Sequence, residues 1–209
     1  MIPVQVLAMR YLANAAPVLA QELGAPKGYP SLALLTTDCD DATYIALDAA
    51  TKAADVAVSY ARSFYAGAAN AGTPYAGEVI GILAGATPGA VRSGMEAARG
   101  ALQRIGFEEV NGVPYLAHTV ASVGTFLAKE AGVKAGSAVA YLIAPPLEGM
   151  YAMDAALKAA DVKLCKLYAP PSETNFGGGL LSGTQSACEA ACAAFAQSVI
   201  DVARMPIER

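Results

Sequence analysis

Carboxylates gather at one place in the first half of the chain. Asp38, Asp40 and Asp41 fall within the phrase "TTDCDDA", and Glu78 follows a glycine-rich stretch further along. Clustered carboxylates attract a small cation and can accept hydrogen bonds from an ammonium group. Helix capping by Asp40 or Asp41 explains one carboxylate but not the cluster. The cluster of Asp38, Asp40, Asp41 and Glu78 therefore predicts a functional acidic site.

The cysteines and the single histidine follow no metal-binding pattern. Cys188 and Cys192 share one face of an expected helix, but Cys39, Cys165 and His118 have no ligand spacing. We expect the cysteines to be small buried hydrophobes and predict no metal site. An enzyme that uses the three carboxylates as acid and base is an alternative, but no nucleophile, metal set or cofactor motif accompanies them.

Two long loops interrupt the regular elements. They read "AGAANAGTPYAG" at 66–77 and "APPSETNFGGG" at 169–179. Structureless segments of this length inside a compact domain are usually functional. We predict a functional role for both loops, with a disordered hairpin tip as the alternative.

The elements that must position these residues occur in the same order in each half. Apolar alternation, acidic helix starts and the Thr87-Pro88 pair predict strands and helices arranged as βαβαββα, twice over. The expected strands are 4–12, 31–37, 56–65, 77–85, 113–121, 138–144, 162–169 and 179–183, and the expected helices are 14–23, 40–55, 88–104, 123–132, 147–161 and 184–204. The predicted fold class is α+β, with small, mostly antiparallel sheets flanked by helices.

The sequence also repeats itself. "DAATKAADV" at 48–56 returns as "DAALKAADV" 106 residues later. A period of this length fits a small domain rather than a solenoid repeat. We predict two domains, 1–105 and 106–209, with a boundary at 106–112. The acidic cluster belongs to the first half only, because "APPLEG" replaces "TDCDDA" in the second.

Composition narrows the class of protein. The chain is 55% apolar and only 15% charged, so part of the outside of its domains must be buried, and contact with further copies is the expected cover. The longest uncharged run, 110–128, contains Pro114 and His118, which argues against a membrane span. The start of the chain has no secretory leader, which predicts a cytoplasmic protein, and a net charge of -4 offers nothing to nucleic acid.

Four long phrases resemble the L-type shell proteins of ethanolamine-utilisation bacterial microcompartments. They are "DCDDATYIALDAATKAADV", "ARSFYAGAANAGTPYAGEVIGILAG", "AYLIAPPLEGMYAMDAALKAADV" and "APPSETNFGGGLLSGTQSACEAAC". The resemblance implies two tandem, circularly permuted microcompartment domains. It also implies a homotrimer that mimics a hexamer and tiles with other shell proteins into a facet.

The resemblance further implies two kinds of pore. The loops would surround a gated central pore, lined by Phe64, Tyr65, Ala66 and Gly67 from the first loop and by Thr174, Asn175 and Phe176 from the second. Each subunit would have a small acidic side pore at Asp40, Asp41 and Glu78 that binds an amino alcohol such as ethanolamine or choline. The resemblance suggests cobalamin binding near the central pore; no other cofactor is expected.

Two other functions fit the same residues. A shell tile of a choline-degrading microcompartment would share the fold and an amine substrate. A soluble trimeric ligand-binding sensor would share the repeated units and the acidic pocket, but it would stay a discrete trimer where a tile forms sheets.

Overall fold

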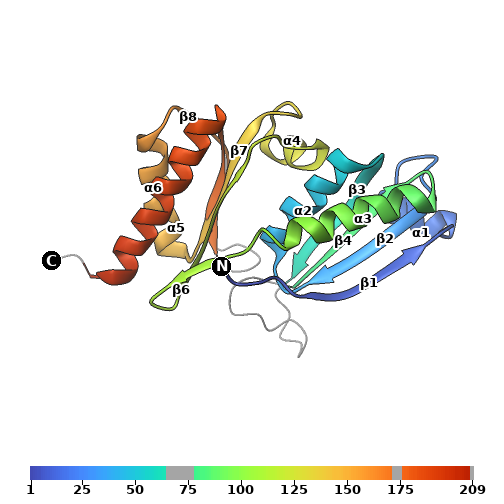
Figure 1. Ribbon diagram of the computed structural model, residues 1–209, viewed down its shortest axis with the longest axis horizontal. Helices are drawn as coiled ribbons and strands as arrows, with labels where there is room; N and C mark the ends of the chain where they lie inside the picture. The colour runs from blue at the N-terminus through green and yellow to red at the C-terminus, as the bar shows by residue number, and fades with distance from the viewer. Residues whose placement is uncertain (65–77, 171–175, 208–209) are drawn as a thin grey trace. The chain divides into compact units, whose positions relative to one another are not determined.

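The computed structural model describes residues 1–64, 78–170 and 176–207, which form two compact units (Figure 1). Unit 2 comprises Pro3–Ile105 and Gly124–Leu127; unit 1 comprises Met1–Ile2, Gly106–Val123 and Ala128–Arg209. Within the described ranges, no helix combines the length and apolar composition needed to cross a bilayer.

Unit 2 is built on a four-stranded antiparallel sheet. The strands lie in the order β1-β2-β4-β3, with β1 (Val6–Leu12), β2 (Ser31–Thr37), β3 (Val56–Phe64) and β4 (Glu78–Gly85). Its complete helices are α1 (Pro17–Glu22), α2 (Asp40–Ala53) and α3 (Pro88–Leu102), and its residues 125–127 begin α4 (Thr125–Ala131).

Successive residues of β4 contact helices on opposite faces of this sheet. Gly81 lies against Leu47 of α2, and a Cβ at Gly81 would overlap that leucine, so the helix comes closer than any larger residue would allow. Ile82, the next residue, joins a core cluster with Ala20 of α1 on the other face. Successive side chains of a strand point to opposite faces of the sheet, so an apolar run such as β4 has apolar residues on both faces, and each face is covered by a helix.

Unit 1 repeats the design with one additional strand. Its sheet has the order β5-β6-β7-β9-β8, formed by β5 (Glu108–Val110), β6 (Val113–Val120), β7 (Ala138–Ala144), β8 (Val162–Tyr168) and β9 (Gly177–Gly183). Two long helices, α5 (Pro146–Ala159) and α6 (Gln185–Arg204), pack on each other and on the sheet.

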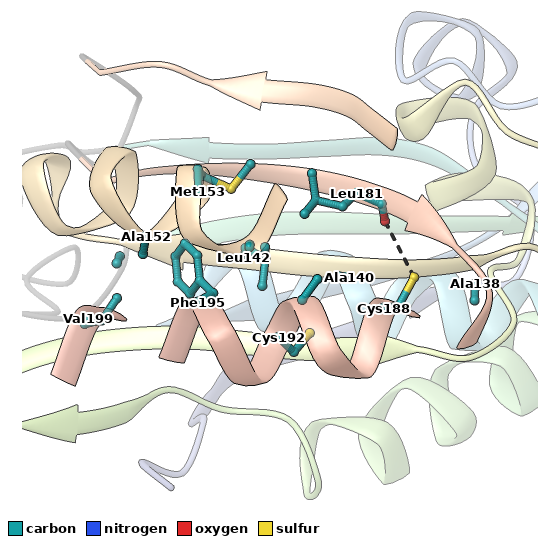
Figure 2. Close-up of a cluster of buried hydrophobic side chains, with 13 residues drawn as sticks. Ala138, Ala140, Leu142, Ala152, Met153, Leu181, Cys188, Cys192, Phe195 and Val199 are labelled. Carbon is teal, nitrogen blue, oxygen red and sulfur yellow. Dashed lines mark hydrogen bonds between the residues drawn. The ribbon is translucent and has the colours of Figure 1, made fainter. Parts of the chain in front are cut away.

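The core of unit 1 lies between α6 and β7. Figure 2 shows Cys188, Cys192, Phe195 and Val199 along one side of α6, at the spacing of a single helix face. Alternate residues of β7, including Leu142, meet them. The expectation that the cysteines are buried hydrophobes is confirmed for Cys39, Cys188 and Cys192, which are 6%, 0% and 7% exposed, but it is wrong for Cys165 on β8, which is only partly buried.

The two units share details that strengthen the case for a repeat. The edge strand has a bulge at matching places, Val58/Tyr60 in β3 and Leu164/Lys166 in β8. Thr87 caps α3 and Thr184 caps α6, each by accepting a hydrogen bond from the backbone N–H three residues on. The α+β class and the repeated order of elements are therefore confirmed.

The sequence did not lead us to expect the short strand β5. The predicted boundary 106–112 contains β5, which pairs with β6 around Asn111 and Gly112. Both turn residues have positive φ, 50° and 78°, as a tight hairpin requires. Asn-Gly is the strongest short hairpin signal, so the hairpin is readable from the sequence despite the three-residue length of β5.

Candidate functional site

The strand register gathers the predicted acidic residues at one end of the unit 2 sheet. Thr37, the last residue of β2, pairs with Val79, and Glu78, the first residue of β4, pairs with Phe64 at the end of β3. The connection from β2 to α2, which contains the aspartates, therefore starts beside Glu78. Asp41 and Glu78 are 37 positions apart in the sequence, and the sheet brings the two segments to the same end.

Hydrogen bonds from Thr37 shape the connection between β2 and α2. Its hydroxyl donates to the Cys39 carbonyl oxygen at 3.0 Å, accepts from the Cys39 N–H at 3.2 Å, and lies 2.7 Å from the Thr43 hydroxyl. Asp38 is turned away into a different contact, where its Oδ1 accepts a hydrogen bond from the Gln5 N–H at 2.8 Å. Asp38 therefore has a structural role at this junction.

Asp40 and Asp41 form the first turn of α2 and are buried in the single chain, at 4% and 6% exposure. The positive end of the helix dipole favours carboxylates there. Asp40 Oδ1 accepts a hydrogen bond from the Asp41 N–H at 2.9 Å, and no side chain caps the helix at Cys39. Two buried carboxylates on adjacent residues exceed what helix capping requires.

The pKa of the Cys39 thiol reflects both its burial and the negative charge at the start of α2. Burial raises the pKa of Cys39 well above its ordinary value, and the next largest cause is the negative charge of Asp41, with smaller contributions from Asp40 and Asp38. A negative potential at this end of the sheet resists thiol ionisation and favours a bound cation. The described residues contain no cluster of His, Cys, Asp and Glu fit to hold a metal ion.

The other predicted site residues are placed only in part. The backbones of Phe64 and Glu78 lie in paired strands, but their side chains fall outside the described residues, as do Tyr65, Ala66, Gly67, Thr174 and Asn175 in full. Phe176 is half-buried, and its ring packs on that of Phe107 with 5.9 Å between centroids. Phe107 itself is 2% exposed, so Phe176 anchors the start of β9 to the core of unit 1.

The second half has no counterpart of the acidic pair. α5 begins after Pro145, and the acidic residue in its first turn is Glu148. Gly149 is buried there, and a Cβ on it would lie 2.6 Å from the Gly177 carbonyl oxygen, so the helix approaches β9 through backbone alone. The predicted asymmetry between "TDCDDA" and "APPLEG" is therefore present in the structure.

Sequence reasoning missed the role of Asp48, which it used only as a marker of the repeat. Asp48 is fully buried, and its two carboxylate oxygens accept hydrogen bonds from the backbone N–H groups of Gly124 and Leu127 at 2.7 and 2.9 Å. Lys52 lies 3.7 Å from the same carboxylate. The available signal was an aspartate in the middle of an alanine-rich helix whose neighbours are apolar.

Comparison with known proteins agrees with this architecture. The sequence pattern of the BMC domain family matches residues 31–122. A solved structure, the ethanolamine utilization protein EutL from Leptotrichia buccalis, superposes with a TM-score of 0.94 at 54% identity and covers 100% of this chain and 98% of that one. The fold is therefore that of a tandem-domain microcompartment shell protein.

Two curated relatives narrow the class. The bacterial microcompartment shell protein EutL of Clostridium perfringens is 54% identical over 206 residues, which cover 97% of this chain and 95% of that protein. The protein of the same name from Salmonella typhimurium is 46% identical over 208 residues, with coverage of 98% and 95%. The chain belongs to the EutL family of bacterial microcompartment shell proteins.

Proposed function

We propose that this chain is a facet tile of an ethanolamine-utilisation microcompartment, and that it assembles as a homotrimer with other shell proteins around it. In this proposal, small amino-alcohol cations pass or bind at an acidic side pore in each subunit. The observation that carries the proposal is the burial of Asp40 and Asp41 at the sheet end where Glu78 begins β4. The names of the relatives support the compartment type.

The acidic site suits an ammonium group for electrostatic reasons. Two carboxylates on adjacent buried residues repel one another, so an incoming cation gains by relieving that repulsion and by donating hydrogen bonds. A pore must also release what it binds. We expect a dissociation constant in the millimolar range, which corresponds to a binding free energy of roughly 4 kcal/mol in favour of the complex. Binding should weaken as the salt concentration rises.

The gated central pore belongs to the same proposal. We assign it to the loop residues named above, with Phe64 and Phe176 at the ends that join the sheets. The contact between Phe176 and Phe107 supports a fixed attachment for the second loop. Cobalamin binding beside this pore stays a prediction, because the loop residues concerned lie outside the described ranges.

Calorimetric titration tests the side-pore assignment. Ethanolamine and choline are titrated into the wild type, Asp40→Asn/Asp41→Asn and a control, Asp38→Asn, whose carboxylate bonds Gln5 instead. We expect the double variant to lose binding, the control to keep it, and all three to keep the same oligomeric state. Equal heats from wild type and double variant would leave helix capping as the role of these carboxylates.

Electron microscopy of the concentrated protein tests the tile itself. A tile forms flat sheets, whereas a soluble sensor stays as separate trimers at every concentration. The relative heats of ethanolamine and choline separate the two compartment types.

A further inference from the structure

The turn of the β5–β6 hairpin consists of an asparagine followed by a glycine. Asn111 and Gly112 are both exposed, and they connect the paired residues Val110 and Val113. Their positive φ angles, 50° and 78°, suit a tight turn. The same dipeptide is also the one in which the backbone attacks an asparagine side chain most easily, because glycine has no Cβ to hinder the approach.

Asn111 is the one asparagine of the chain that precedes a glycine. The other three, Asn14, Asn70 and Asn175, precede alanine or phenylalanine. The space at Gly112 is open, since a Cβ added there would meet no atom within 4 Å. Among the described residues, no backbone carbonyl accepts a hydrogen bond from the Gly112 N–H. The backbone nitrogen that follows Asn111 is therefore accessible and unhindered.

Asn111 also has a structural role that depends on its amide group. Its Nδ2 donates a hydrogen bond to the Ala203 carbonyl oxygen at 3.3 Å, and Figure 1 shows the hairpin beside the last turn of α6. The last four carbonyl groups of an α-helix have no partner within the helix. Ala203 is the last residue but one of α6, so the Asn111 amide caps one of these carbonyls. The hairpin and the helix end are thus joined through a donor that the amide supplies.

We infer that Asn111 deamidates spontaneously in the folded protein, and that its conversion releases the end of α6 from the β5–β6 hairpin. Hydroxide takes the proton from the Gly112 N–H, and the nitrogen attacks the side-chain carbonyl carbon of Asn111 to form a new C–N bond. The bond from that carbon to Nδ2 then breaks. Nδ2 takes up a proton and leaves as ammonia, and a five-membered succinimide remains.

Water completes the reaction. It adds to one of the two carbonyl carbons of the succinimide, and the bond from that carbon to the Gly112 nitrogen breaks. Addition at the side-chain carbon gives isoaspartate's isomer, ordinary aspartate, whereas addition at the main-chain carbon gives isoaspartate, in which the backbone runs through the side chain. One water is consumed and one ammonia is released overall, so no oxidant or reductant is needed.

Either product acts against the contact with Ala203. A carboxylate cannot donate a hydrogen bond to a carbonyl oxygen, and it places a negative charge at the negative end of the α6 dipole. Glu108 and Glu109 already contribute two carboxylates to the same hairpin, so a third adds repulsion. Isoaspartate also lengthens the backbone of the turn by one carbon, which disturbs the pairing of Val110 with Val113.

Incubation followed by peptide mapping tests the modification. The purified full-length protein is kept at physiological temperature and mildly alkaline pH, mass spectrometry follows the exchange of NH₂ for OH at each asparagine, and an isoaspartate methyltransferase labels isoaspartate. Asn14 is the matched internal control, because it is exposed and precedes Ala15. We expect Asn111 to convert at least about tenfold faster than Asn14. If Asn111 converts in urea-unfolded protein but not in folded protein, the turn protects it and the inference is wrong.

Gly112→Ala tests the route of the reaction. The added methyl group crowds the attacking nitrogen, so conversion of Asn111 should slow by at least about tenfold. The positive φ of Gly112 strains an alanine, but the hindrance is local to the dipeptide and persists even if the turn opens. Conversion at the wild-type rate would rule out attack by this nitrogen.

Two further substitutions test the consequence for α6. Asn111→Asp reproduces one product, whereas Asn111→Gly removes the donor without adding a charge and accepts the positive φ. Hydrogen exchange at 202–205 should become about three- to tenfold faster in Asn111→Asp, and the increase should be smaller in Asn111→Gly. Equal exchange in wild type and Asn111→Asp would show that the amide does not hold the helix end, and would overturn that part of the inference.

Discussion

Removal of the Asp48 carboxylate should destabilise the fold more than any surface charge change. In Asp48→Ala, the buried N–H groups of Gly124 and Leu127 lose both acceptors. An unsatisfied buried donor costs about 1–3 kcal/mol, so the two together should lower the free energy of unfolding by about 3–5 kcal/mol. Asp48→Asn keeps the shape and one acceptor but turns an NH₂ group toward the second N–H, and we expect about 2–3 kcal/mol.

Urea unfolding at one fixed protein concentration measures the loss, since assembly makes stability concentration-dependent. Hydrogen exchange gives the local readout: protection at 124–127 should fall in both variants. Asp201→Asn is the matched control, because Asp201 is exposed on α6 and accepts a hydrogen bond from Gln197 one turn earlier, so the free energy of unfolding should change by no more than about 0.5 kcal/mol. A loss below about 1 kcal/mol for Asp48→Ala would refute the reasoning.

Two further predictions concern the helix ends and the core of unit 1. The Thr87 and Thr184 hydroxyls each accept a hydrogen bond from a backbone N–H at the start of a helix, so Thr87→Ala and Thr184→Ala should each lower the free energy of unfolding by about 1 kcal/mol. The corresponding serine variants keep the hydroxyl and should keep most of the wild-type stability. Burial raises the pKa of Cys192 from 9.0 to about 11, although Thr119 donates a hydrogen bond to its sulfur. The folded-state pKa is the higher one, so this contribution to stability is complete below pH 9 and is lost between pH 9 and 11. Urea midpoints at pH 8, 10 and 11 should fall more steeply for wild type than for Cys192→Ala; parallel curves would contradict the assignment.

Local sequence patterns predicted the helices and strands well where neighbouring residues mark both the start and the end of an element. β2 and β7 begin and end at the predicted residues, because each is an apolar run bounded by polar or turn residues. The Thr87 cap was equally readable, since a hydroxyl followed by proline specifies a helix start through neighbours alone.

Contacts between distant segments could not be read in the same way. Asp48 lies 76 residues before Gly124, and its burial depends on a segment that no local pattern connects to α2. The carboxylates at 40 and 41 were predicted as a cluster, but their burial follows from the packing of α2, and the pairing of Glu78 with Phe64 follows from the sheet register.

The difference between α2 and α5 has a consequence for how such a protein can change. When a single domain is used in several copies, each substitution appears in every copy, including those where the new residue is harmful. With both copies on one polypeptide, Asp41 and Leu147 occupy the same place in the fold yet mutate independently. Doubling of the domain thus allows one copy to acquire an acidic pair at the start of its helix while the other copy keeps an apolar residue there.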